Sequence, residues 1–426
     1  MERYKSYKDS GIEWIGKIPS HWKIYRFKDF LTLQNVVSSN ENKIGLENIE
    51  GGTGRFIETN TDFDGNGIEF DVGDIVYGKL RPYLQKVWVA TFNGNAVGDF
   101  FVFRTKPICD RRYVFYVMLS EGFTAICNGA TFGTKMPRVS SDFIRCLHFY
   151  LPPFVEQQAI AAYLDKRCSE IDKAIATQQK RIALLQELKQ SIITHAVTRG
   201  IHPDVPLKES GVEWIGQVPS HWIHFRIKFC LSRSVAGIWG DDEKGNKDDI
   251  VCFRVADFDY SKGCLTFDKL TIRNVSAAQL QNRLLHDGDL LIEKSGGGDT
   301  TPVGRVVRFT YNDKAICSNF IHSISVKEGY CSNYLYYYFY GMYADKVNLL
   351  YFNQTTGIQN LKVGEYLSQK IYLPTLVEQQ AIAVYLDGRC SEIDKAIATQ
   401  QKRISLLQEL KQSIITEAIT GKIKVC

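Results

Sequence analysis

The chain has 426 residues, with 52 basic and 47 acidic side chains and a formal net charge of +5. Its hydrophobic fraction of 44% and charged fraction of 23% are ordinary for a globular protein and exclude a chain that is disordered throughout. At roughly 150 residues per domain, the length suggests two or three domains. The small positive charge permits a nucleic-acid partner but does not indicate one.

Neither a membrane segment nor an export signal is expected. The N-terminus is charged, and no run approaches the ~18 apolar residues of a membrane-spanning helix. The 11 cysteines include no CxxC pair, which argues against a zinc ribbon, and their scatter is not that of a disulfide framework. We therefore expect a cytoplasmic protein with reduced thiols.

The N-terminal segment Ser10–Lys28 returns as Ser210–Lys228, with 12 of 19 positions identical. Each copy contains a His-Trp pair, His21-Trp22 in the first and His221-Trp222 in the second. Because no metal-binding or catalytic histidine spacing surrounds either pair, we expect them to cap or pack a repeated frame.

Two segments of sparse mutual similarity follow the repeats, 29–150 (the first insert) and 229–372 (the second insert). Both alternate short apolar runs with turn residues, which predicts an α+β fold shared by the two, with different surfaces. The aromatic run Tyr334–Tyr340 predicts a buried helix or strand. The predicted strands are Ile75–Tyr77, Val87–Phe92 and Phe100–Phe103 in the first insert, and Leu290–Ile292 and Val306–Phe309 in the second.

A longer repeat follows each insert: Leu151–Gly200 and Leu373–Lys422 are identical at 41 of 50 positions. Apolar residues recur every three or four positions, which predicts a helix over about 155–198, roughly 65 Å long, or two pieces broken near Asp165–Ser169. The stripe comprises Ile160, Leu164, Ile171, Ile175, Ile182, Leu185 and Ile192 in the first copy, and Ile382, Leu386, Ile393, Ile397, Ile404, Leu407 and Ile414 in the second.

Neither stripe can be buried by its own helix. We expect the two helices to pack antiparallel under a pseudo-two-fold relation; the alternative is that each packs only on its own insert. The predicted division is 1–150 (frame and first insert), 151–200 (first helix), 201–372 (linker, repeated frame and second insert) and 373–426 (second helix). One scaffold with two different inserts suggests two different specificities.

No catalytic motif is found in the sequence. It contains no GxxxxGK[ST] loop, no HExxH and no GxGxxG, so we expect no enzyme activity and no metal or cofactor bound by this chain. Asp242-Glu243-Lys244 and Glu41-Asn42-Lys43 match the tail of a nuclease pattern, but such matches occur at chance frequency.

The remaining candidates are basic and amide side chains on the inserts. Arginine and lysine suit guanine edges and phosphates, whereas asparagine and glutamine suit adenine edges. The alternative is an ordinary solvated surface, since the net charge of the first insert is −2 and that of the second is 0. The candidate DNA contacts are Lys79, Arg81, Tyr83, Lys86, Lys135 and Arg138 in the first insert, and Lys294, Ser295, Arg305, Asn319, Gln359, Asn360 and Lys362 in the second.

In this order of segments the chain resembles the specificity subunits of type I restriction–modification systems. The resemblance covers essentially the whole chain, although no single motif is decisive. The residues that carry it are Ser210–Gly216 with Pro219–Trp222, Leu151–Pro153 with Glu156–Gln158, Gly73-Asp74 with Lys79–Tyr83, Gly288-Asp289 with Lys294–Gly296, and Ile414–Gly421.

The resemblance implies that each insert is a target recognition domain reading one half of a bipartite, asymmetric DNA site. It implies that the helices form a coiled-coil spacer and dock two methyltransferase subunits, which restriction subunits join. S-adenosylmethionine, ATP and magnesium would belong to those partners. The alternatives are a coiled-coil scaffold whose two domains bind ligands other than specific DNA, and an enzyme with an unrecognised site.

Overall fold

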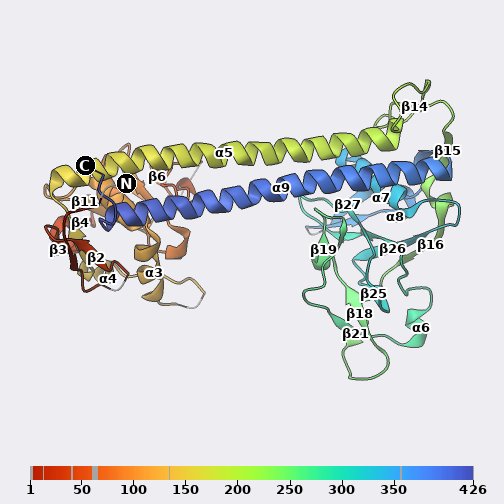
Figure 1. The fold of residues 1–426 in the computed structure, drawn as a ribbon. Coiled ribbons are helices and arrows are strands. Elements are labelled where there is room, and N and C mark those ends of the chain that lie inside the picture. The colour runs from red at the N-terminus through yellow and green to blue at the C-terminus, as the bar shows by residue number, and fades with distance from the viewer. Residues whose placement is uncertain are drawn as a thin grey trace. The chain divides into compact units, whose positions relative to one another are not determined.

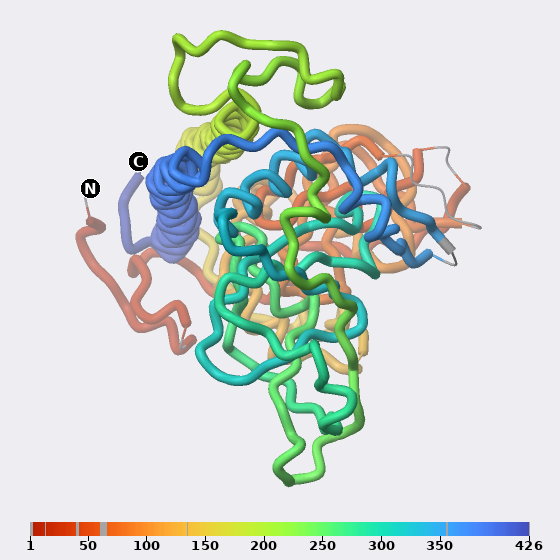
Figure 2. The backbone as a smooth tube through the Cα atoms, turned by 90° about the vertical axis from the view of Figure 1, so that its right-hand side faces the viewer, coloured from red at the N-terminus to blue at the C-terminus, as the bar shows by residue number. Residues whose placement is uncertain are grey.

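The structure is a computed structural model that describes residues 3–12, 14–39, 42–59, 66–133, 135–355 and 357–425. The chain divides into two compact units, Met1–Gln179 with Lys402–Cys426, and Lys180–Gln401. The boundary falls inside both long helices, α5 (Phe154–Arg199) and α9 (Leu376–Ile419), and both chain ends belong to the first unit (Figures 1 and 2). Both helices are continuous, so the predicted break near Asp165–Ser169 is wrong.

The repeated N-terminal segments form the same small frame in both units. A hairpin comes first, β1 (Tyr7–Asp9) with β2 (Lys17–Pro19), and again β13 (Leu207–Glu209) with β14 (Gln217–Pro219). The next strand pairs with the strand that leads into the long helix. These pairs are β3 (Lys23–Arg26) with β12 (His148–Leu151), and β15 (Ile223–Arg226) with β29 (Lys370–Leu373). In each unit, the strand before the insert thus pairs with the strand at the end of the insert.

Both inserts are built on a four-stranded antiparallel sheet of the same strand order, as expected for a shared fold. Most predicted strands are observed, although Val87–Phe92 is shorter. The sheets run β4 (Leu31–Gln34), β11 (Phe100–Thr105), β8 (Ile75–Gly78), β9 (Val87–Val89), and β16 (Leu231–Ala236), β26 (Ile321–Val326), β22 (Leu290–Glu293), β24 (Val306–Arg308).

A second sheet extends each insert, and the second insert has further strand pairs. In the first insert its order is β5 (Val37–Ser38), β7 (Gly67–Phe70), β10 (Gly94–Ala96), β6 (Lys43–Ile44). In the second it is β17 (Asp241–Asp242), β21 (Ile272–Asn274), β18 (Asp249–Phe253), β25 (Ala315–Cys317). The further strands are β19 (Phe258–Asp259), β20 (Cys264–Leu265), β23 (Ser295–Gly296), β27 (Phe352–Thr355) and β28 (Ile358–Leu361).

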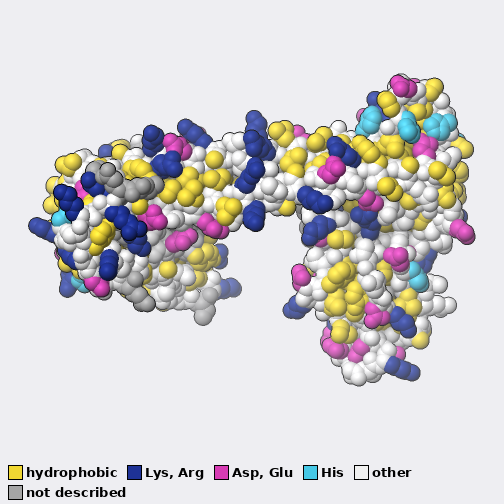
Figure 3. Space-filling view, viewed as in Figure 1, with side chains coloured by type: hydrophobic (Ala, Val, Ile, Leu, Met, Phe, Trp, Pro, Cys, Tyr) yellow, Lys and Arg dark blue, Asp and Glu magenta, His cyan; other side chains and the backbone are white. Residues whose placement is uncertain are grey.

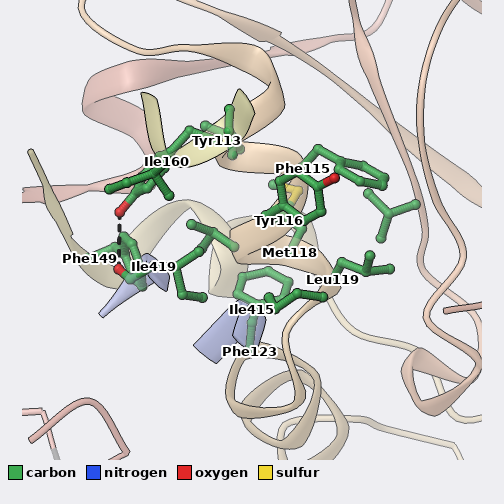
Figure 4. Packing of buried hydrophobic residues seen from close by; sticks show 14 of the residues in the cluster. Tyr113, Phe115, Tyr116, Met118, Leu119, Phe123, Phe149, Ile160, Ile415 and Ile419 are labelled. Carbon is green, nitrogen blue, oxygen red and sulfur yellow. Dashed lines mark hydrogen bonds between the residues drawn. The ribbon is translucent and has the colours of Figure 1, made fainter. Parts of the chain in front are cut away.

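A buried helix joins each main sheet to the long helices. In the first unit it is α2 (Arg111–Leu119), capped by Asp110; in the second it is α7 (Ser332–Ala344), which contains the predicted aromatic run. Figure 4 shows the core of the first unit, in which α2, α5 and α9 all take part, among them through Tyr113, Ile160 and Ile415. The shorter helices are α1 (Phe27–Phe30), α3 (Glu121–Gly129), α4 (Ser141–Cys146), α6 (Ala277–Leu280) and α8 (Val363–Tyr366).

Within each unit, segments of the two long helices run antiparallel. In the first unit, Glu156 at the start of α5 and Gly421 just beyond α9 both lie against Trp22. Further along, Asp172 of α5 accepts a hydrogen bond of 2.8 Å from Lys411 of α9. Because the start of one helix and the end of the other share a neighbour, the two segments run in opposite directions.

The second unit repeats this arrangement with the roles of the helices exchanged. Glu378 at the start of α9 and Gly200 just beyond α5 both lie beside Trp222, and Lys189 donates to Asp394 over 2.8 Å. The expected antiparallel packing is therefore observed inside each unit. The alternative also holds in part, since Ile160, Leu164 and Ile171 share one core with α2 of the first insert.

The predicted stripe is most buried toward the ends of the helices. The buried members are Ile160, Leu164, Ile171, Ile382, Leu386, Ile393 and Ile414, and the half-buried members are Ile175, Ile182, Leu185, Ile192, Ile397, Ile404 and Leu407. Among the described residues, no helix carries an apolar stretch long enough to cross a membrane.

Candidate nucleic-acid interface

A buried aspartate begins the central strand of each insert. Asp74 and Asp289 are each 2% exposed, and each accepts a backbone hydrogen bond of 2.9 Å that closes the preceding turn. Each carboxylate also pairs with a guanidinium from another strand of the same sheet, Arg104 on Asp74 and Arg233 on Asp289. Since a buried carboxylate is stable only with such partners, these pairs fix the strand that leads to the candidate contacts.

The residue after each central strand sits in the same backbone setting. The Lys79 N–H donates to the Asp99 carbonyl over 2.9 Å, and the Lys79 carbonyl accepts from Val139 over 3.1 Å. Lys294 makes the matching bonds with Phe320 and Leu361, both at 2.8 Å. In each insert, the end of the central strand is thus crossed by a segment from much later in the sequence, which contains Val139 in the first insert and Leu361 in the second.

In the first insert this crossing gathers most of the predicted contacts at one place. Bridges join Leu80 to Arg138 and Phe132 to Arg138, and the Arg81 N–H donates to the Pro137 carbonyl over 2.8 Å. The half-buried Lys79 places its Nζ 5.5 Å from the centre of the Phe101 ring. The side chains of Arg81, Tyr83, Lys135 and Arg138 are exposed.

Lys86 has an internal role. Its Nζ donates to the carbonyls of Leu46 and Ile49 over 2.6 and 2.7 Å. Burial lowers the pKa of this ammonium group. Lys86 therefore holds the turn at 46–48 rather than extending toward a ligand.

In the second insert the crossing is a three-stranded sheet, ordered β23, β28, β27. Ser295 pairs with Asn360 across it, and the Ser295 hydroxyl donates to Asn360 Oδ1 over 2.7 Å. Lys294 is half-buried, whereas Asn319 and Asn360 are exposed beside it. Lys362 lies at the end of β28, with its Nζ 4.0 Å from Glu365.

Arg305 and Gln359 also have internal partners. The Arg305 guanidinium donates to the buried Glu293 over 2.8 Å and stacks 3.6 Å from the centre of the Tyr260 ring. Gln359 is 3% exposed and accepts from the Val303 N–H over 3.1 Å. Arg305 and Gln359 thus both hold the loop that follows β23 in place.

Two exposed amides in the second insert were missed by sequence reasoning. Asn353 and Gln354 lie on β27, and Asn353 pairs directly with Asn360. The matching place in the first insert carries Phe132, which is 57% exposed. The only available signal was the glycine at 357, which marks a turn between two short strands.

The charged side chains of the second insert do not form a broad surface of one sign. On the face of the second insert seen in Figure 3, basic and acidic side chains are interspersed. His322 lies beside Lys294 and shares a hydrogen bond of 2.8 Å with Ser234. Burial, helped by the Lys294 charge, lowers the pKa of His322 to about 4, so this ring is neutral near pH 7.

No group of three His, Cys, Asp or Glu side chains in the described ranges is arranged to hold a metal ion. A cavity of about 560 Å³ in the second unit is lined by Tyr260, Arg305 and Tyr343, among others. Burial raises the pKa of Tyr260, and Arg305 is already paired with Glu293, so this cavity gives no support to acid–base catalysis.

Comparisons with known proteins give a consistent result. A family profile described as "Type I restriction modification DNA specificity domain" matches residues 19–186 and 246–409. The EcoDI specificity subunit of Escherichia coli is 28% identical over 192 residues, which is 43% of this chain and 43% of that protein. The MjaVIII specificity subunit of Methanocaldococcus jannaschii is 24% identical over 333 residues, 75% of this chain and 71% of that protein.

A solved structure described as concerning complex assembly and conformational transition of the type I R-M system shares the fold. It has a TM-score of 0.71 at 15% identity and covers 95% of this chain and 99% of its own. Because the family profile matches well over half of the residues, the chain belongs to the type I restriction modification DNA specificity family, as a DNA sequence-specificity subunit with two tandem domains.

Proposed function

We propose that each insert reads one half of a bipartite, asymmetric DNA site and that the chain itself performs no chemistry. One observation carries this proposal. The repeated frame holds two inserts in which a crossing segment presents a different exposed side chain beside the end of the central strand, Arg138 in one insert and Asn360 in the other. Two readers of different chemistry suit a site whose halves differ. The functional division is then 1–150, 151–200, 201–372 and 373–426.

The proposed contacts follow the accessible side chains. Lys79, Arg81, Tyr83, Lys135 and Arg138 would serve the first half-site, and Lys294, Asn319, Asn360 and Lys362 the second. Lysines supply salt-dependent affinity through phosphates, and base-edge contacts supply discrimination. Lys86, Ser295, Arg305 and Gln359 would act indirectly, by supporting the segments and side chains that make these contacts.

The long helices would set the gap between the half-sites and dock two methyltransferase subunits. Exposed leucines support this role, because Leu184 and Leu188 on α5 match Leu406 and Leu410 on α9, 222 residues later, all 45–55% exposed. Exposed apolar pairs in two copies suit two identical partners. Figure 3 shows hydrophobic side chains at the surface of both helices.

The remaining partners and cofactors complete the proposal. Restriction subunits would join the methyltransferase complex, and S-adenosylmethionine, ATP and magnesium would act in those partners. Each methyltransferase would flip its target adenine out of the DNA stack. We place the complex in the cytoplasm, which suits the ten described cysteines, all free of disulfides.

A map of modified bases tests the proposal. The chain is expressed with its methyltransferase subunit in a host that lacks adenine methylation, and the genome is sequenced for modified adenines. We expect one motif of two short blocks separated by a nonspecific gap. Exchanging 29–150 for the matching insert of a relative should change one block only. A continuous motif, or none, would contradict the proposal and favour a scaffold that does not read DNA.

Matched insertions test the spacer role. Four residues are added after Gln178 and four after Gln400, because the Asp172–Lys411 and Lys189–Asp394 pairs fix the helix register within each unit. Four residues add about 6 Å of helix, so the gap should grow by one to two base pairs. An insertion in α5 alone is the control and should destabilise the protein. An unchanged gap in the double insertion would refute the spacer role.

A further inference from the structure

The two inserts present different exposed side chains, Arg138 and Asn360, at one equivalent backbone position. We propose that Arg138 selects a guanine in the half-site of the first insert and that Asn360 selects an adenine in the half-site of the second. This rests on the proposed function and deepens it, because it names the base chemistry that separates the two halves.

The equivalence of the two positions follows from hydrogen bonding alone. Val139 and Leu361 are the residues whose N–H groups donate to the carbonyls of Lys79 and Lys294. Arg138 and Asn360 directly precede them, and each pairs with the residue after that lysine, Leu80 or Ser295. Both side chains therefore leave the same edge of the same crossing.

Arg138 has the chemistry and the freedom to read guanine. Its side chain is exposed, and among the described residues its guanidinium has no hydrogen-bond or ion-pair partner. A guanidinium only donates, and guanine presents two acceptors, O6 and N7, in the major groove. Adenine presents one acceptor beside a donor, so the fork of Arg138 favours guanine.

The backbone at Arg81 also favours a functional arginine cluster in the first insert. Arg81 has φ +48°, whereas the matching residue of the second insert is Gly296 with φ +119°. A left-handed conformation costs an arginine about 1 kcal/mol that a glycine avoids. The Arg81 N–H donates to the carbonyl of Pro137, the residue before Arg138, so hydrogen-bonded backbone segments carry both exposed arginines.

Asn360 is oriented for adenine by its neighbour. The Ser295 hydroxyl donates to Oδ1 and so distinguishes the oxygen of this amide from its nitrogen. One lone pair of Oδ1 and both Nδ2 protons remain. Adenine requires one acceptor for its N6 amine and one donor for N7, which this oriented amide supplies.

Single substitutions in the methyltransferase complex test the assignment. Methylation is measured on oligonucleotides that carry each of the four bases at every specified position. We expect Arg138→Ala to reduce selection of one guanine by about 5- to 150-fold in one half-site, with the other half unchanged. Asn360→Ala should do the same to one adenine in the other half. Asn360→Asp, which keeps the acceptor for Ser295, should shift that position toward cytosine.

The controls separate base reading from folding and charge. Arg55→Ala removes a charge from an exposed side chain of the first insert, 72% accessible, and should leave the motif unchanged. Arg138→Lys keeps the charge without the fork and carries the test if the alanine variant fails to fold. A uniform loss on all sequences, or relaxation at a base other than guanine for Arg138 or adenine for Asn360, would overturn the inference. A wild-type complex without a bipartite motif would instead refute the proposed function.

Discussion

The two inserts satisfy the same buried carboxylate with arginines from different strands. Asp74 pairs with Arg104 of β11, whereas Asp289 pairs with Arg233 of β16. Within the sheet, Arg104 stands opposite Thr32, and Arg233 stands opposite Ser325. The aspartate therefore occupies the same position in both inserts. Its arginine occupies one member of a cross-strand pair in the first insert and the other member in the second.

The same exchange occurs where each insert meets its long helix. Asp165 of α5 pairs with Arg112 of α2 and accepts from the Tyr116 hydroxyl over 2.7 Å. Asp387 of α9 accepts from the Tyr337 hydroxyl over 2.7 Å, but its arginine, Arg308, comes from β24. The comparison teaches that each carboxylate keeps its position in both units, whether it is buried (Asp74 and Asp289) or partly exposed (Asp165 and Asp387). The guanidinium that meets it comes from a different element in the second unit.

Moving the arginine of the first insert is the strongest test of this comparison. Arg104→Ser leaves Asp74 buried without its main partner and should cost about 2–4 kcal/mol of stability. Adding Thr32→Arg copies the second insert and should restore most of that loss, since the two side chains are cross-strand neighbours. Hydrogen exchange of β8 and β11 measures both effects. A double variant no more stable than Arg104→Ser would contradict the exchange.

The frame was predictable from sequence, but these exchanges were not. Identical segments at fixed spacing indicated two long helices and one module repeated twice, because identical stripes must be buried alike. Gly73-Asp74 and Gly288-Asp289 marked the start of equivalent strands. The arginine that meets each aspartate comes from elsewhere in the chain, and its identity depends on strand pairing that no local pattern encodes.

The candidate site was predictable in location and less so in detail. Lys79 and Lys294 follow the marked strands, and the later segments with Arg138 and Asn360 precede the helices at similar distances. The sequence could not distinguish Arg305, which Glu293 and Tyr260 hold internally, from Arg138, which is exposed. Both are arginines in polar surroundings, and only the fold decides which faces solvent.

The glutamates that start the long helices offer a second comparison. Glu156 accepts hydrogen bonds from Tyr4, from His21 over 2.8 Å and from Trp22 over 3.1 Å. Glu378 accepts from His221 over 2.9 Å and Trp222 over 3.0 Å. These contacts are consistent with a structural role for the repeated His-Trp pairs.

Alanine at each glutamate should therefore affect the two units unequally. Glu156→Ala leaves the buried Trp22 N–H unpaired and removes one more donor contact than Glu378→Ala, so we expect losses of about 3 and about 2 kcal/mol. Hydrogen exchange reads each unit separately, which a single melting curve does not. Tyr4→Phe should reduce the excess. Equal losses in both variants, with Tyr4→Phe silent, would show that the third donor contributes nothing.

Acid should weaken the second unit through a residue that the first unit lacks. His322 stands where the first insert has Phe101, each opposite the central strand. Its folded pKa, about 4, lies below the ordinary value of 6.5, so the unfolded state binds more protons between these values. Stability is therefore lost as the pH falls from 6.5 toward 4, by about 2 kcal/mol at pH 4.5.

The variant His322→Phe, which copies the first insert, isolates this effect. Unfolding of β22 and β26 is compared at pH 7 and pH 4.5 for the wild type and the variant. Contributions from other titrating groups cancel in the difference. The variant should lose about 2 kcal/mol less on acidification. Equal pH sensitivity in both proteins would exclude His322 as the source.

The smallest expected difference concerns the lysines that join the helices within each unit. Lys411 donates to Asp172 over 2.8 Å and to the Gly52 carbonyl over 3.2 Å; Lys189 donates to Asp394 over 2.8 Å and to the Ser261 carbonyl over 3.0 Å. Each lysine thus ties both helices to the insert of its own unit.

Methionine at these positions keeps the apolar stem and removes the ammonium group. Because both aspartates are more than a third exposed, water replaces part of the lost interaction, and each variant should cost only about 1 kcal/mol. Lys411 is the more buried lysine, with 6% of its side chain accessible against 12% for Lys189, so Lys411→Met should cost slightly more. Hydrogen exchange of the 46–54 and 258–265 segments measures the two losses. A larger loss for Lys189→Met would mean that the contact to the insert, rather than burial of the ion pair, dominates the joint.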